Sequence, residues 1–217
     1  YDIVPEKSNT RAVRLQVKLD LENGLASGVC DEISKGYDAY FKRNRLASLS
    51  SEEYLEEIEK GNSDGFFVND YEIVEEQSDE KNLVERYSFE LEGVEPSGTI
   101  YFNPFIIRYF KNNPFKAETR SYPVDFGYLR KFNYMAKIEV PEGYKIKESP
   151  APVNLALPDG SGVLRFNTTE IQGDVMVIFS LQLKSTQYNN AGYSYIKKFF
   201  SNAVASQNQS YVVLEKE

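Results

Sequence analysis

The side chains of this chain that could do chemistry are carboxylates, because it contains no histidine and a single cysteine. Without an imidazole it cannot form the Ser-His-Asp or Cys-His-Asp arrangements of hydrolases, or the common histidine-ligated zinc and iron sites. The Gly-rich phosphate-binding motifs are also absent. Cys30, in LASGVCDEI, is interpreted as a small buried hydrophobic residue with no histidine to activate it.

Asp125 is the acid with the most suggestive setting, since it lies in YPVDFGY among aromatic and turn-forming residues. Burial among rings can raise a carboxyl pKa, and a glycosidase needs two carboxyl groups about 5 to 10 Å apart. A lone acid in an apolar motif is more often held by a nearby arginine. We therefore predict a structural ion pair between Arg120 and Asp125, assign no catalytic residue, and expect that the chain is not an enzyme.

The sequence also bears on metal and sugar ligands. The turns NSDG and PDGSG lack the spaced oxygen ligands of an EF-hand loop and are typical of turn chemistry, so no metal and no cofactor is predicted. Sixteen tyrosines without a tryptophan leave a sugar-binding surface open as an alternative. The usual state of a strand tyrosine is nevertheless a partly buried ring with a solvated hydroxyl.

The charge of the chain limits its partners. A net charge of -8 argues against nucleic-acid binding, which depends on clustered lysine and arginine. Residues 1–98 carry 23 acidic and 11 basic side chains and residues 99–217 carry 10 and 14, or about -12 and +4, which favours two units. The sequence contains no apolar run near the ~18 residues that span a bilayer, and no signal-peptide pattern.

The first half of the chain is predicted to mix helices and strands. AVRLQVKLDLENG alternates apolar and polar residues and closes in an Asn-Gly turn, which predicts an opening β-hairpin. In GYDAYFKRNRLASL the residues Tyr37, Tyr40 and Phe41 fall at helical spacing, and in SSEEYLEEIEKG a capping box of Ser50 and Glu53 starts a second helix. Residues 66–103 are predicted to form three strands.

The second half is predicted to be an antiparallel β-sandwich with one packed helix. Five alternating segments follow one another at short spacing: FNYMAKIEV, GYKIKES, VNLAL, GVLRFNTTEI and DVMVIFSLQLK. GYSYIKKFFSNAVAS has an apolar helical stripe that includes Tyr195, and SYVVLEK is a last strand. The expected fold class is therefore mainly β with α (α+β), with a mixed α/β domain at residues 1–115 and the sandwich at residues 116–217.

The two domains are expected to meet in NPFKAETRSYPVDFGY, residues 113–128. Pro114 and Pro123 each restrict the preceding residue to extended conformations, which fits a rigid linker. We therefore interpret this stretch as a junction rather than a catalytic loop.

Several short patterns occur in the order found in one family. They are LDLENGLASGVCDEISKGYDAYFKRNRL, IYFNPFI, NPFKAETRSYPVDFGY, IEVPEGYKIKESP and GYSYIKKFFSNAVASQNQSYVVLEKE. Together they resemble the region downstream of the papain-like core in large bacterial transglutaminase-like envelope proteins. The matching positions include the turn at Arg120 and Pro123 and the helix at Tyr195, and none of them is catalytic in that family.

The resemblance implies a non-catalytic accessory module in the periplasm or at the bacterial cell surface. Its expected partner is an upstream transglutaminase-like core or another envelope protein, which it would position or bind. The alternative is a carbohydrate or peptidoglycan binding module. The catalytic Cys, His and Asp of that core are expected in a segment upstream of Tyr1.

Overall fold

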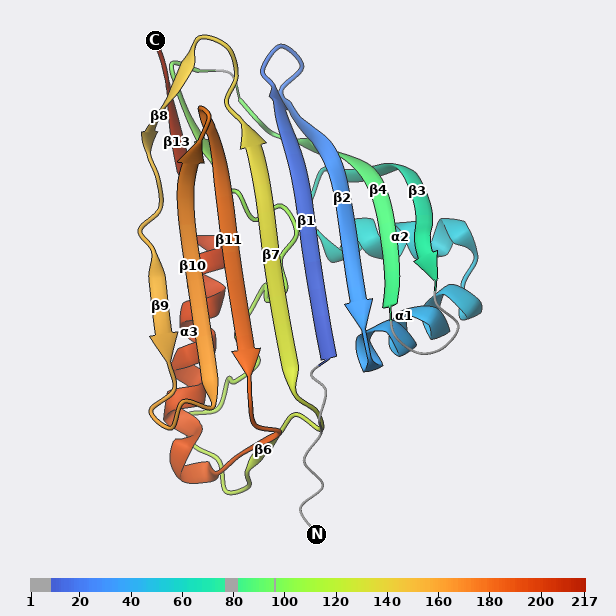
Figure 1. Cartoon of the computed structure of the whole chain (residues 1–217), viewed down its shortest axis with the longest axis vertical. Helices are drawn as coiled ribbons and strands as arrows, with labels where there is room; N and C mark the ends of the chain where they lie inside the picture. The colour runs from blue at the N-terminus through green and yellow to red at the C-terminus, as the bar shows by residue number, and fades with distance from the viewer. Residues whose placement is uncertain (1–8, 77–81, 96) are drawn as a thin grey trace.

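The computed structural model describes residues 9–76, 82–95 and 97–217. Its main element is an eight-stranded sheet with the order β3-β4-β2-β1-β7-β11-β10-β9 (Figure 1). The strands of this sheet are β1 (Asn9–Asp20), β2 (Leu25–Lys35), β3 (Phe66–Glu76), β4 (Asn82–Glu92), β7 (Arg130–Glu139), β9 (Val153–Ala156), β10 (Gly162–Ile171) and β11 (Asp174–Leu183). Neighbouring strands are antiparallel except β1 and β7, which are parallel.

Smaller elements complete the fold. A three-stranded sheet has the order β5-β13-β8, and a two-stranded sheet pairs β12 with β6. Their bounds are β5 (Thr99–Phe102), β6 (Val124–Asp125), β8 (Tyr144–Glu148), β12 (Gln187–Tyr188) and β13 (Val212–Lys216). The helices are α1 (Tyr37–Ser48), α2 (Ser51–Gly61), the short 3-10 helix η1 (Asn190–Gly192) and α3 (Tyr193–Asn208).

The large sheet has one apolar face and one solvated face, as the alternation of β1 requires. Val13, Leu15 and Val17 are buried, whereas Arg14 and Lys18 between and beside them are exposed. The helices α1, α2 and α3 lie on one side of the sheet: α1 runs across the lower ends of β2 and β4, α2 lies behind β2, β4 and β3, and α3 lies behind β10 and β9 (Figure 1). The core therefore lies between the sheet and these helices.

The parallel pairing of β1 and β7 joins the two halves of the chain. Val13 is aligned with Tyr134, Leu15 with Ala136, and Val17 with Ile138, and all six side chains are buried. Left unpaired, either strand would expose a row of backbone N–H and C=O groups at a sheet edge. The pairing removes both edges and merges their apolar faces into one core.

The mainly β, α+β class predicted from the sequence is confirmed, as are the hairpin, the capping box of α2 and the strands of the second half. The strands of residues 116–217 do not close into a sandwich of their own, however. Strands from both sides of residue 115 contribute to the eight-stranded and to the three-stranded sheet. The reasons are the β1–β7 and β5–β13 pairings, contacts between distant segments that no local pattern encodes.

Residues 113–128 also differ from the expected linker, because they pack along α3. Phe115 is buried, with its ring centroid 5.1 Å from that of Phe200. The Asn113 amide donates to Lys197 O at 2.9 Å, and the hydroxyl of Tyr193 donates to Ala117 O at 2.9 Å. The stretch is thus an anchored connection from β5 to β7, fixed by aromatic packing and hydrogen bonds to the helix.

Candidate functional site

The predicted pair of Arg120 and Asp125 is not formed. The Asp125 carboxylate accepts the Gly127 N–H at 2.7 Å and the Gln187 side-chain amide at 2.9 Å, and these hydrogen bonds lower its pKa. The Arg120 guanidinium instead lies 5.9 Å from the ring centroid of Tyr193. The prediction was wrong because Asp125 is exposed at a turn, where backbone N–H groups satisfy it without an arginine.

The other two residues singled out in the sequence lie at the surface. Pro123 is exposed immediately before β6. Tyr195 is 56% exposed on α3, whereas Tyr193, Ile196 and Phe200 are buried. The helical stripe was therefore predicted correctly except at Tyr195, which faces away from the core.

A buried cluster of charges lies between α1, α2 and the sheet, and the sequence reasoning missed it. Lys42 of α1 is hydrogen bonded to the Glu85 carboxylate and lies 3.1 Å from that of Glu32, which is also bonded by Arg11. Glu85 further accepts the hydroxyls of Tyr54 at 2.5 Å and Tyr71 at 2.9 Å. Two carboxylates thus face two cations, and the cluster is close to neutral.

The electrostatics of the cluster favour a structural role over acid–base chemistry. Burial would raise the pKa of Glu32, but the charges of Arg11 and Lys42 outweigh it and lower the pKa to about 2. Burial and the carboxylate of Glu85 raise the pKa values of Tyr54 and Tyr71, which therefore stay protonated donors. Burial also raises the pKa of the neighbouring Cys30 thiol, as expected for an inert residue.

A signal for the cluster was present in the sequence. Glu32 is two residues from Cys30, and Glu85 is two residues from Tyr87, so both acids lie in the apolar phase of their strands. A charge at an inward-facing strand position must be paired, because burying it alone is costly. The phase of Glu32 and Glu85 was thus a signal for buried partners that the sequence analysis did not use, although it would not have identified Lys42.

The cluster has a consequence for the orientation of α1, whose Lys42 side chain faces the sheet. Besides Lys42, Arg43 donates to Asn82 O at 3.0 Å. The aromatic residues face solvent instead, with Tyr37 and Tyr40 each 56% exposed and Phe41 52% exposed. A helix packed on a sheet usually shows the opposite arrangement.

These rings form a contiguous surface with a residue from the second half of the chain. The centroid of Tyr37 lies 6.4 Å from that of Phe41 and 5.2 Å from that of Tyr128, and Tyr40 lies 5.7 Å from Phe41. We call Tyr37, Tyr40, Phe41 and Tyr128 the α1 aromatic surface. Three of these rings are exposed and Tyr128 is half-buried. Contiguous exposed aromatic groups mark interaction sites more often than isolated exposed residues do.

The chain enters the fold beside this surface. The Asn9 side chain accepts the N–H of Tyr37 at 2.6 Å and so caps α1, and the Asn9 N–H donates to Leu129 O at 2.9 Å. Gly36 permits the close approach of the Asn9 side chain to the start of α1. Its φ is +64°, and a Cβ at this position would lie 2.2 Å from the Asn9 side-chain oxygen. Figure 1 shows the start of β1 next to the first turn of α1.

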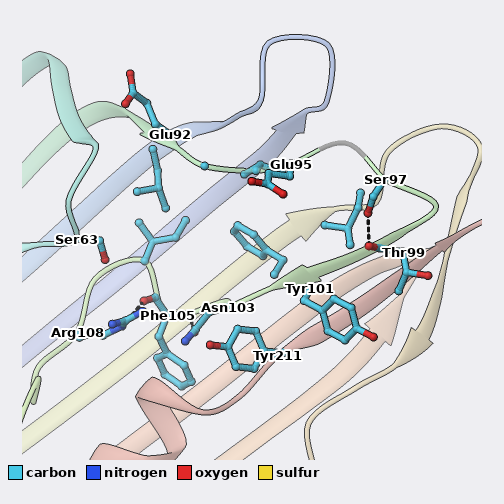
Figure 2. A pocket seen from close by; sticks show the side chains of 16 residues that line it. Ser63, Glu92, Glu95, Ser97, Thr99, Tyr101, Asn103, Phe105, Arg108 and Tyr211 are labelled. Carbon is cyan, nitrogen blue, oxygen red and sulfur yellow. Dashed lines mark hydrogen bonds between the residues drawn. The ribbon is translucent and has the colours of Figure 1, made fainter.

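A second feature is a hollow of about 410 Å³ beside the three-stranded sheet (Figure 2). Tyr101 and Tyr211 lie at its rim and are 69% and 45% exposed. Glu92, Glu95 and Arg108 line it and supply polar groups of both signs. Exposed rings beside hydrogen-bonding groups could stack on the apolar face of a sugar and bond its hydroxyls.

Among the residues that the structure describes, no group of three or more His, Cys, Asp or Glu side chains could hold a metal ion. None of the helices within residues 9–76, 82–95 and 97–217 has the length and apolar character needed to cross a bilayer.

The chain belongs to the family described as a domain of unknown function with solved structure (DUF3858), which it matches over residues 98–213. A search of curated proteins found no match. A solved structure of a "putative protease" from Parabacteroides distasonis is similar with a TM-score of 0.43 and 14% identity over 72% of this chain. The chain spans 24% of the length of that structure.

Proposed function

We propose that this chain is a non-catalytic accessory module of a transglutaminase-like envelope protein, and that the α1 aromatic surface docks it onto the upstream core of the same polypeptide. The orientation of α1 carries the proposal. Lys42 and Arg43 fix the helix to the sheet through polar contacts, and Tyr37, Tyr40 and Phe41 remain exposed. Packing of the fold does not require these rings to face solvent, whereas docking does.

The choice of the upstream core as the occupant rests on where the chain enters the fold. Asn9 contacts Tyr37 and Leu129, so the described part of the chain begins beside the α1 aromatic surface. A domain attached there has a high effective concentration for this surface. The sequence resemblance supports the same arrangement and a periplasmic or cell-surface location.

The absence of a catalytic role for the chain is part of this proposal. The Glu32 and Glu85 carboxylates are buried and held by Arg11, Lys42 and tyrosine hydroxyls. The Asp125 carboxylate is committed to a turn. Each of these acids is explained by the fold alone.

The docking proposal can be tested with the upstream region produced separately. Calorimetric titration of that region with the chain should show saturable binding, and replacing Tyr40 and Phe41 together by Ser should weaken it at least about tenfold, since each aromatic side chain buries apolar area in the contact. Tyr195→Ser is the matched control because Tyr195 has the same exposed fraction as Tyr40 on another helix. Equal affinity of the two variants, or no binding by the unchanged chain, would reject the proposal.

A carbohydrate or peptidoglycan binding module is the second candidate function, and the hollow at Tyr101 and Tyr211 favours it (Figure 2). Saturable binding of soluble peptidoglycan fragments that is lost in Tyr211→Ala and Tyr101→Ala would support it. Tyr122→Ala is the control, since Tyr122 is 80% exposed and does not line this hollow. Titrations without heat above dilution would remove this candidate.

A further inference from the structure

A second hollow, of about 400 Å³, lies among the connection from β5 to β7, the first residues of β7, and α3. Five phenylalanines line it: Phe110, Phe115, Phe126, Phe132 and Phe200. Phe115 and Phe200 are buried and form its floor, whereas Phe110, Phe126 and Phe132 are half-buried. We call this cavity the phenylalanine hollow.

The phenylalanine hollow suits an apolar ligand. The rings contact one another at defined angles, with Phe110 and Phe200 edge to face at 5.2 Å and Phe126 stacked on Phe200 at 6.0 Å. Because the rings already hold each other in place, a ligand would enter a preformed site. Covering the half-buried rings removes apolar area from water, which stabilises the complex by about 25 cal/mol for each Å².

Two arginines add a positive charge to this apolar hollow. Arg120 and Arg130 both line it, and neither forms an ion pair with an acid in the described part of the chain. The Arg130 guanidinium lies 4.6 Å from the ring centroid of Tyr128 and 5.5 Å from that of Phe126. Its Nε is buried and has no hydrogen-bond partner among the described residues. A buried donor of this kind calls for an acceptor.

The other charged groups of the hollow leave this positive charge in place. Asp125 lines the hollow, but its two oxygens accept from Gly127 and Gln187. Lys111 lines it too and donates its ammonium group to Asn62 O. Asp38 of α1 feels the charge of Arg130 but is not ion-paired with it. Among the lining residues one carboxylate, Asp125, therefore faces the three cations Lys111, Arg120 and Arg130, and Asp38 lies near Arg130 outside the lining.

We infer that the phenylalanine hollow binds an apolar group that carries a carboxylate, with the apolar part among the five rings and the carboxylate held by Arg130 and Arg120. Guanidinium groups match a carboxylate with two parallel N–H donors, which lysine cannot supply. Such a ligand has two sources, a free apolar carboxylic acid or the C-terminal residue of a peptide. The inference does not rest on the docking of α1, although Arg130 stacks on Tyr128 of the α1 aromatic surface.

Calorimetric titration of the whole chain at pH 7 with small probes tests this site. 4-Phenylbutyrate stands for a free acid, and N-acetyl-phenylalanine stands for a peptide end. Each is compared with its own amide, which has the same shape without the charge. Both acids should bind saturably. The affinity of each amide should be lower by about tenfold or more, because a hydrogen bond to a charged group contributes about 1.5 kcal/mol or more. Tighter binding of one acid identifies the source.

Variants separate the contribution of Arg130 to binding from the effect of a change in the net charge of the chain. Arg130→Gln should weaken binding of the preferred acid about tenfold and leave the binding of its amide almost unchanged. Arg165→Gln removes the same charge from an exposed position of β10 outside the hollow and should have little effect. Phe126→Leu should weaken the binding of the acid and of the amide by a similar factor. The unfolding midpoint of this variant shows whether it is still folded.

Three results would overturn the inference. They are the absence of saturable binding of either acid, equal affinity for an acid and its amide, and an effect of Arg165→Gln as large as that of Arg130→Gln. None of these measurements involves an upstream region, so a negative result for the phenylalanine hollow would not affect the docking proposal.

Discussion

The ring of Tyr37 lies 5.2 Å from the ring of Tyr128, so the α1 aromatic surface is built from both halves of the chain. Tyr37 begins α1, and Tyr128 lies two residues before β7. The β1–β7 pairing that joins the halves therefore also fixes this surface, because Asn9 at the start of β1 bonds to Tyr37 on one side and to Leu129 on the other. Fold and candidate site depend on the same contacts.

The buried cluster should dominate the attachment of α1. Lys42→Met leaves the carboxylates of Glu85 and Glu32 buried with fewer partners and should lower the free energy of unfolding by about 3 kcal/mol, as when one member of a buried pair is removed. Lys60→Met is the matched control, since Lys60 pairs with Glu56 on the exposed face of α2. Urea unfolding measures both. Equal midpoints for the two variants would show that the cluster does not hold the helix.

The low pKa of Glu32 predicts acid sensitivity in a defined pH range. The folded-state pKa is about 2, below the ordinary value of 4.5, so the stabilisation is fully present above pH 4.5 and is lost as the pH falls toward 2. The loss should reach about 3 kcal/mol from this group. Glu32→Gln should flatten the dependence of unfolding free energy on pH in that range.

A direct measurement avoids any effect of the Glu32 substitution on folding. The carboxyl carbon of Glu32 can be followed by NMR in the unchanged chain as the pH is lowered. A titration midpoint near the ordinary value would contradict the pairing with Arg11 and Lys42.

Cys30 should be unreactive in the folded chain. It is fully buried in β2, and burial raises the pKa of its thiol, so the reactive thiolate is scarce. A maleimide should label it slowly without denaturant and rapidly in denaturant. Rapid stoichiometric labelling of the native chain would require a different environment for this residue.

Replacement of Asp125 by Asn should leave the stability of the fold almost unchanged. Its carboxylate is exposed and accepts the N–H of Gly127, and the oxygen of an Asn side chain can accept the same bond. Asp125→Asn should hardly move the unfolding midpoint, whereas Asp125→Ala should lower it measurably because the turn loses its acceptor. A clear loss of stability in Asp125→Asn would contradict this expectation and would support the ion pair with Arg120 that was predicted from the sequence.

Local patterns predicted most of the elements but not how distant elements pair. The alternation of Val13, Leu15 and Val17 and the capping box at Ser50 are encoded within a few residues, and both were predicted correctly. The pairing of β1 with β7 depends on residues that are far apart in the chain, and the expected sandwich was replaced by a shared sheet for that reason.

The candidate site was harder to predict for a related reason. The spacing of Tyr37, Tyr40 and Phe41 identified a helix correctly, but helical spacing does not say which face meets the sheet. Lys42 fixes this orientation of α1 through its ion pairs with Glu32 on β2 and Glu85 on β4. The charges of Glu32 and Glu85 in the apolar phase of two strands were the available clue.

Hydroxyl-radical footprinting of the parent protein tests the docking of the α1 aromatic surface most directly. The modification rates of Tyr37, Tyr40 and Phe41 are compared between the isolated chain and the polypeptide that includes the upstream region. Tyr195 and Tyr122 serve as internal references, since both are exposed away from this surface. We expect the three α1 residues to be modified severalfold more slowly in the parent protein while the references are unchanged; equal rates in both proteins would contradict the docking of this surface.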